Sequence, residues 1–412
     1  MSTEYSKFIH LFNKRKLLLG LSLFSGLILY FLLSSGPGLS NDSVLYIDIS
    51  KNIVLGNGMS SKLNNQQSIL HSPPMFPLLL SLFEYLGFSA LHAARIVNST
   101  CFALRLQLLL ITGLQEKNFL LSPFVSLFLF AFSVITLRVF SMVWTEGPFI
   151  CTFLYSLYFL DESLDKHSYR NLCFSAIFAA IGIMFRYVGV TVVIATIICI
   201  LLLDNRKLIK RIISALLFGF ISLLPLLIFI GVNVKILLSM AGQTLSFHPF
   251  STGHIRQFIR TFLFIFFQDS IIEKVKISPV FQILLAVMTG VGLIFALRYL
   301  LKHADWSQTC KIVSELDRMC KIMLIFIFSY IAFIIFSISF IDCNIPMSYR
   351  ILSPVWVALS ALIPLAAPHA LNLLEMRAKK LISLLAVLYI ISAILRAVLF
   401  MVDVKVNGLG YS

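Results

Sequence analysis

Seven ionisable residues stand out because they border or interrupt long apolar runs. They are Asp42, Asp48, Glu146, Arg186, His248, Asp342 and Arg350. Charged groups at the edge of a hydrocarbon layer are costly, so they tend to serve a function. A carboxylate can take a proton from a hydroxyl group, and an arginine can bind phosphate through two parallel hydrogen bonds. These residue types predict a site that handles a phosphate-bearing substrate.

Asp42 is the leading candidate for a general base. Asp42, Tyr46 and Ile49 fall on one face of a short helix that would follow the first apolar run. Such a helix would direct the carboxylate and the phenol to the same place. Alternatively, Asp42 only caps this helix, because every residue of Ser40–Ser43 is of a capping type. Asp48 is the fallback candidate.

Three further residues begin or end apolar segments in the same way. Glu146 opens a segment after Thr145, where it would contact a substrate, or else cap a helix N-terminus. Arg186 and Arg350 are expected to hold a phosphate, although each could instead extend to the lipid headgroups.

Four more side chains complete the predicted site. Arg256 and Arg260 would add to the anion-binding charge of the arginine pair. Tyr187 and His248, together with Tyr46, are expected to contact the substrate. Alternatively, His248 is only a loop histidine that hydrogen-bonds to the backbone.

These residues must be positioned by membrane helices. The chain has 412 residues, of which 59% are hydrophobic and 12% charged. Apolar stretches of about 20 residues are long enough to cross a hydrocarbon core as helices. We therefore predict an all-α polytopic membrane protein, with residues 1–412 forming one transmembrane domain. Eleven spans are expected, at about 17–34, 91–112, 120–139, 146–161, 172–185, 188–204, 208–231, 278–301, 321–341, 350–367 and 380–402.

The lysine and arginine residues predict the orientation of these spans. Cytoplasmic loops collect such residues near the ends of spans. This rule is obeyed when the N-terminus is cytoplasmic and Pro73–Gly87 does not cross the membrane. Pro73–Gly87 and Phe258–Phe267 are therefore predicted to be interfacial or re-entrant helices. They would lie in two large outer loops, residues 35–90 and 232–277, on the same side as the candidate site residues.

Composition and motifs exclude several other classes of protein. The net charge of +15 is scattered over the loops, so no nucleic-acid partner is expected. The seven cysteines form no C-x-x-C pair, which argues against a zinc site or a disulfide framework. The chain has no P-loop after a strand, no G-x-S-x-G and no H-E-x-x-H, so nothing indicates ATP-driven transport, serine hydrolysis or zinc proteolysis.

An ordered set of motifs resembles a known family. The first outer loop carries Asp42-Ser43, Tyr46, Gly56, Gly58, Pro73-Pro74 and Pro77, and later motifs are Arg95 with Asn98, T-E-G-P-F at 145–149, F-R-Y at 185–187, F-H-P at 247–249 and Y-R-I-L-S-P at 349–354. Over residues 36–360 this set is similar to membrane glycosyltransferases with the GT-C fold. These include protein O-mannosyltransferases, aminoarabinose transferases and rhizobial lipopolysaccharide sugar transferases.

The resemblance implies a substrate and a mechanism. The donor would be a polyprenyl-phosphate sugar, the acceptor a glycan, lipid or protein, and the reaction an inverting transfer. The catalytic acidic residue of the family falls on Asp42. Its neighbours are Asn41 and Ser43 rather than a second acid, so a single base is favoured over a metal-binding pair. The acceptor or the sugar would be contacted by Glu146, Tyr46, Tyr187 and His248. No cofactor is expected, although a divalent metal remains open. The implied location is a bacterial inner membrane, with membrane lipids around the chain and the active site on the outer face.

Three other functions remain open at this stage. A transporter or flippase of lipid-linked glycans would need polar groups at all membrane depths, whereas these gather on one side. A polymerase or ligase of surface polysaccharide would share the chemistry but concentrate its arginines in a late outer loop. A non-enzymatic scaffold is the third alternative.

Overall fold

The computed structural model describes residues 2–61, 72–113, 133–233, 247–249, 251–266, 317–372, 394 and 396–405. Within these ranges the chain is helical apart from loops and one isolated bridge between Gly38 and Met142. The prediction of an all-helical protein is confirmed for this part of the chain.

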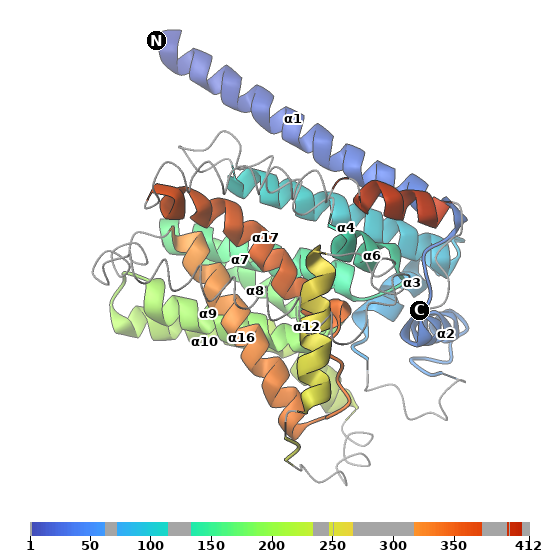
Figure 1. Ribbon diagram of the computed structural model, residues 1–412. Helices are drawn as coiled ribbons and strands as arrows, with labels where there is room; N and C mark the ends of the chain where they lie inside the picture. The colour runs from blue at the N-terminus through green and yellow to red at the C-terminus, as the bar shows by residue number, and fades with distance from the viewer. Residues whose placement is uncertain are drawn as a thin grey trace.

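The N-terminal third forms one long helix followed by shorter ones. Their bounds are α1 (Ser2–Leu32), η1 (Leu33–Ser35), α2 (Asn41–Val54), α3 (Met75–Tyr85) and α4 (Ala90–Gly113). Helix α1 packs along α4, where the hydroxyl of Ser22 donates to the carbonyl oxygen of Ala103 at 2.5 Å. Figure 1 shows α2 and α3 together at one end of the bundle, near the point where α1 ends.

The middle of the chain supplies most of the bundle. It comprises α6 (Val134–Ser141), α7 (Glu146–Lys166), α8 (Tyr169–Phe185), η2 (Tyr187–Gly189), α9 (Val190–Leu203) and α10 (Leu208–Val232). Helices α7 and α8 pack closely, and the hydroxyl groups of Ser156 and Ser175 each donate to the carbonyl oxygen of the other residue. Such pairing satisfies polar groups away from water.

The C-terminal part adds α12 (Thr252–Phe266), α16 (Arg318–Phe340), α17 (Tyr349–Asn372) and a helical segment over residues 396–405. Helix α16 packs on α9 and α17, and Phe153 of α7 stacks on Phe326 of α16 with ring centroids 4.6 Å apart. Helix α12 runs across the direction of α7 and α9 rather than along it (Figure 1).

Some of these helices are long and apolar enough to cross a membrane. Among the described residues, α10 and α16 meet this criterion by length and composition. Helices α3 and α4 meet it jointly, but they are bent by 117° at their junction. Such a bend fits an interfacial helix beside a span. That α3 does not cross the membrane stays a prediction. The number of eleven spans also stays a prediction, because 278–301, most of 120–139 and most of 380–402 lie outside the described residues.

Loops with many lysines and arginines meet at one end of the bundle, here called the basic end. His167, between α7 and α8, lies 3.9 Å from Asp204, between α9 and α10. Arg318, at the start of α16, pairs with Asp161 at 2.6 Å and with Asp165 at 3.2 Å, both near the end of α7. Three loops predicted to be cytoplasmic thus lie together, which agrees with the predicted order of the spans.

Candidate active site

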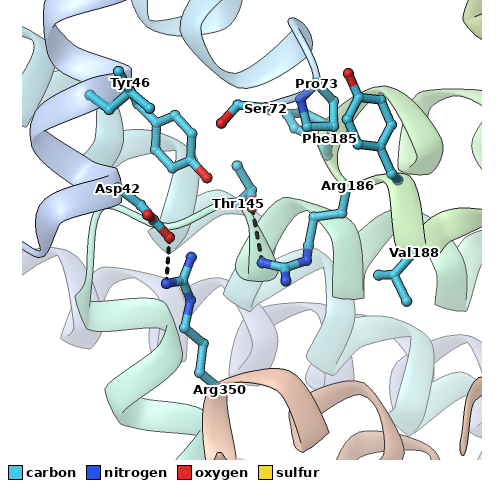
Figure 2. Close-up of a pocket in the computed structure, with 11 residues that line it drawn as sticks. Asp42, Tyr46, Ser72, Pro73, Thr145, Phe185, Arg186, Val188 and Arg350 are labelled. Carbon is cyan, nitrogen blue, oxygen red and sulfur yellow. Dashed lines mark hydrogen bonds and ion pairs between the residues drawn. The ribbon is translucent and has the colours of Figure 1, made fainter. Parts of the chain in front are cut away.

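A cavity of about 410 Å³ opens at the opposite end of the bundle, here called the site end. It is lined by Asp42, Leu45, Tyr46, Ser72, Pro73, Thr145, Phe185, Arg186, Tyr187, Val188 and Arg350. Figure 2 shows Asp42 and Tyr46 on one side, with Arg186 and Arg350 approaching from two other elements. The predicted face of Asp42 and Tyr46 thus opens onto the predicted arginine pair.

Helix α2 is fixed at its first turn by serines. The side chain of Ser40 accepts a hydrogen bond from the Ser43 backbone N–H, and that of Ser43 accepts one from the Ser40 N–H. This reciprocal pair is a capping box. Ser40 therefore fills the capping role that the sequence left open for Asp42. The carboxylate of Asp42, in the first turn, is left to face the cavity.

The loop before α2 is joined to the loop before α7. Gly38 donates from its backbone to Ser141 and accepts from Val143, both at 2.9 Å. The hydroxyl of Ser43 donates to the carbonyl oxygen of Val143, also at 2.9 Å. In addition, the amide of Asn98 on α4 donates to Met142 at 2.6 Å. These bonds hold the beginning of α2 beside the beginning of α7, about 100 residues later in the chain.

Trp144 links the cap of α2 to Arg350. Its indole N–H donates to the Ser40 hydroxyl at 2.8 Å, and the guanidinium carbon of Arg350 lies 4.6 Å from the centroid of its ring. An arginine over a tryptophan face is attracted by the ring electrons. This platform was not predicted from the sequence, although Trp144 directly precedes the T-E-G-P-F motif.

Arg186 is placed by a sharp turn between α8 and α9. It is the C-cap of α8, with its backbone N–H bonded to Gly182. The turn closes through Gly189, where a Cβ atom would lie 2.8 Å from the backbone nitrogen of Ile183. Only glycine allows so close an approach of two backbone segments. The turn also brings Tyr187 and Val188 to the cavity wall.

Arg350 is placed by the first turn of α17. The hydroxyl of Tyr330, on α16, donates to the carbonyl oxygen of Ile351 at 2.8 Å, and the hydroxyl of Ser353 donates to that of Arg350 at 2.7 Å. Tyr330 is buried. The start of α17, from which the long side chain of Arg350 extends, is therefore hydrogen-bonded to α16.

Four charges from four elements alternate around the site. Arg350 binds Asp42 through Nη1 at 2.6 Å and Glu146 through Nε at 2.5 Å. Arg186 binds the same Oε1 atom of Glu146 through Nη1 and reaches the Thr145 hydroxyl at 3.3 Å. The carboxylate of Glu146 is 1% exposed, the two arginine side chains are 17% and 21% exposed, and that of Asp42 is 48% exposed. Glu146 is thus a buried counter-ion beneath the arginines, whereas Asp42 is accessible.

Two tyrosines line the cavity as hydrogen-bonding groups. Burial raises the pKa of Tyr46, and the carboxylates of Glu146 and Asp42 raise it further. Burial also raises the pKa of Tyr187 to about 12. Both phenols stay protonated near neutral pH and can donate hydrogen bonds to a substrate. The ring of Tyr46 packs edge-on against Phe76 of α3, with centroids 5.4 Å apart.

Other predicted site residues lie away from the cavity lining. Asp48 accepts a hydrogen bond from the Ser61 hydroxyl at 2.7 Å, which ties down the segment after α2. His248 donates from its backbone to Ser339 at the end of α16. Arg256 and Arg260 lie exposed on α12, and Asp342 accepts from the backbone of Asn344. The structure therefore does not bring these residues to the pair of Arg186 and Arg350.

A metal site does not emerge from the described part of the chain. No group of three or more histidine, cysteine, aspartate or glutamate side chains lies close enough there to hold an ion. Asp42 and Glu146 are both occupied by arginine.

Comparison with known proteins supports the resemblance found in the sequence. The family model described as dolichyl-phosphate-mannose-protein mannosyltransferase matches residues 71–229, which is less than half of the chain. This range contains Glu146 and Arg186 but neither Asp42 nor Arg350. The match indicates an integral membrane glycosyltransferase of the GT-C type. Searches of curated proteins and of solved structures gave no match.

Proposed function

We propose that the chain transfers a sugar from a polyprenyl-phosphate carrier to a hydroxyl group of a glycan, lipid or protein acceptor, on the outer face of the membrane. One observation carries this proposal: an accessible carboxylate, Asp42, and two arginines, Arg186 and Arg350, border the same cavity. A base and a phosphate site at this spacing are the two parts that such a transfer needs.

The arginines would bind the phosphate of the donor. Arg186 uses only Nη1 in its described bonds, and Arg350 uses only Nη1 and Nε. Each guanidinium group has five N–H donors, so donors remain for phosphate oxygens. Glu146 keeps the two cations close together despite their mutual repulsion, because it accepts from both. We expect the phosphate to lie between Arg186 and Arg350, with the prenyl chain extending towards the lipid.

Donor binding would also release the base. In the structure, Nη1 of Arg350 is bonded to Asp42. A phosphate oxygen competes with this carboxylate for the same donor. When Arg350 turns to the phosphate, the exposed carboxylate of Asp42 is freed to accept a proton from the acceptor hydroxyl.

The transfer is a single displacement. The acceptor oxygen attacks the anomeric carbon and forms the new glycosidic bond while the bond between that carbon and the phosphate oxygen breaks. The proton of the hydroxyl passes to Asp42, and the bonding electron pair leaves with the polyprenyl phosphate. Attack opposite the leaving group inverts the anomeric centre.

The charges of the site favour this step. Two arginines and two carboxylates are neutral together, so a donor diester enters a site with no net charge. As the bond breaks, the phosphate gains a negative charge and Asp42 gains a proton. The site then carries a net charge of about +1 beside the departing phosphate. Charge that develops in the transition state is thus stabilised by groups already in place.

The identity of the donor tests this proposal. Purified protein in vesicles would be offered a polyprenyl-phosphate sugar or the corresponding nucleotide sugar, and the transfer of radiolabel to an acceptor extract would be followed. The proposal expects transfer from the lipid-linked donor alone, with inverted stereochemistry. Transfer from the soluble nucleotide sugar would contradict it. Arg186→Gln is the control, because loss of a phosphate-binding side chain should abolish the transfer.

A further inference from the structure

Helix α12 presents two different faces. One face carries His254, Gln257 and Thr261, and it is hydrogen-bonded to the segment before α17. The other carries Ile255 and Ile259, which are 48% and 37% exposed. At 100° per residue, positions 256 and 260 lie directly beside this apolar stripe, and both are exposed arginines.

Such a pattern fits the surface of a bilayer. An apolar stripe flanked by basic side chains lies in the interface plane, with the apolar residues towards the acyl chains and the cations at the headgroups. Helix α12 runs across the direction of α7 and α9, as a helix in the membrane plane would (Figure 1). Its basic stripe is complementary in charge to anionic phospholipid headgroups.

The inner face of α12 connects this surface to the cavity. The Met347 backbone N–H donates to the side-chain oxygen of Gln257 at 2.9 Å, and the hydroxyl of Thr261 donates to the Met347 carbonyl oxygen at 2.8 Å. Nε2 of His254 lies 3.0 Å from the carbonyl oxygen of Cys343. Met347 is buried and lies three residues before Arg350. A shift of α12 would therefore move the base of the Arg350 side chain.

We infer that α12 is a docking helix for anionic phospholipid, and that its docking positions Arg350 through Met347. The first half concerns a surface and is independent of catalysis. The second half rests on the proposed function, because it expects anionic lipid to strengthen the binding of a polyprenyl phosphate. Arg256 and Arg260 thus contact the bilayer rather than the donor phosphate that the sequence assigned to them.

Contact with the bilayer can be measured without any substrate. A fluorescent dye at Ile259→Cys, with the native cysteines replaced, would be tested in vesicles that contain nitroxide-labelled lipid. Strong quenching is expected in vesicles of phosphatidylcholine mixed with phosphatidylglycerol. Quenching should be weaker in vesicles of phosphatidylcholine alone. Absence of quenching in both vesicles would overturn the inference. A dye at Asn205→Cys, which is exposed in the loop between α9 and α10, reports the background.

Coupling to the cavity needs a binding measurement. Radiolabelled polyprenyl phosphate should bind about tenfold more tightly when phosphatidylglycerol is present, since each basic residue near an anionic surface contributes several-fold. Arg256→Lys with Arg260→Lys should keep this difference, because surface attraction needs charge and not a planar fork. Gln257→Leu with Thr261→Val should abolish the difference while leaving the dye quenched.

Other outcomes would assign the arginines differently. If the lysine variant bound polyprenyl phosphate more weakly in both kinds of vesicle, the arginines would hold the donor itself and the inference would be overturned. If the parent bound equally well in both, the coupling would be refuted. Failure of polyprenyl phosphate to bind under any condition would refute the proposed function, and the quenching result would still decide the lipid surface.

Discussion

The two ends of the bundle both contain arginine–carboxylate pairs, but they are built differently. At the basic end, Asp204 binds Arg206, only two residues away, and its side chain is completely buried. At the site end, the paired charges come from four separate elements. Asp42, Arg186 and Arg350 border a cavity, and Glu146 is buried beneath the two arginines. The pair of Asp204 and Arg206 stabilises the loop between α9 and α10. The arrangement at the site end places Asp42, Arg186 and Arg350 beside a cavity, and the proposal that the site end is the functional end rests on this difference.

The largest effect is expected at Glu146, the buried carboxylate that two arginines share. Glu146→Ala would leave Arg186 and Arg350 partly buried without their shared carboxylate. Breaking a buried ion pair costs about 3–5 kcal/mol, so the apparent melting temperature of the purified protein should fall sharply and turnover should be lost. Glu84→Ala is the matched control, since it removes only the bond from Ser50 and should cost about 1 kcal/mol. Equal melting temperatures for the two variants would refute the counter-ion role.

A smaller effect is expected when Arg186 or Arg350 is replaced by lysine, which keeps the positive charge but lacks the planar guanidinium group. Arg186→Lys and Arg350→Lys cannot form the planar fork that binds a phosphate through two bonds. Affinity for polyprenyl phosphate should fall about 10- to 100-fold in either variant, while the protein stays folded. Arg206→Lys at the basic end should bind polyprenyl phosphate like the parent. A similar loss of affinity in Arg206→Lys would show that the effect is not specific to the cavity, and it would contradict the assignment of Arg186 and Arg350 as the phosphate site.

The smallest effect on activity is expected at the basic end. Burial alone would raise the pKa of Asp204, but hydrogen bonds and charge from Arg206 more than offset this and lower it. A lowered pKa means that the ionised carboxylate stabilises the fold above its unfolded pKa, which is near 3.8, and that this contribution is lost as the pH falls through the lower folded value.

Asp204→Asn should therefore reduce stability by about 2 kcal/mol at neutral pH. Turnover per folded molecule should stay unchanged. The stability difference between parent and variant should shrink as the pH falls below 4, which thermal unfolding at several pH values would measure. A difference that persists at low pH would indicate packing rather than ionisation as its cause.

Much of this contrast could be predicted from the sequence, for a physical reason. Lysine and arginine in loops indicate which span ends share a side, so Asp42, Glu146, Arg186 and Arg350 were expected at one end. Helical spacing also predicted that Asp42 and Tyr46 share a face.

Roles that depend on packing could not be predicted. The burial of Glu146 under two arginines arises from contacts among α7, α8 and α17, which are distant in sequence. The Trp144 platform depends on a loop joined to Ser40 by hydrogen bonds. For Arg256 and Arg260, composition identified the charge, but only the bonds of Gln257 and Thr261 show which face of α12 is turned inwards.

Asp42→Asn is the measurement that tests the account most directly. Turnover and polyprenyl phosphate binding would be measured in one preparation, with Asp48→Asn as the control because Asp48 lies outside the cavity lining. The amide cannot accept the proton and releases Arg350 from its ion pair. We predict turnover at least about 100-fold slower, with binding as tight as in the parent or tighter, and a mild effect for Asp48→Asn. Near-parental turnover in Asp42→Asn, or a greater loss in Asp48→Asn, would contradict the assignment of Asp42 as the base.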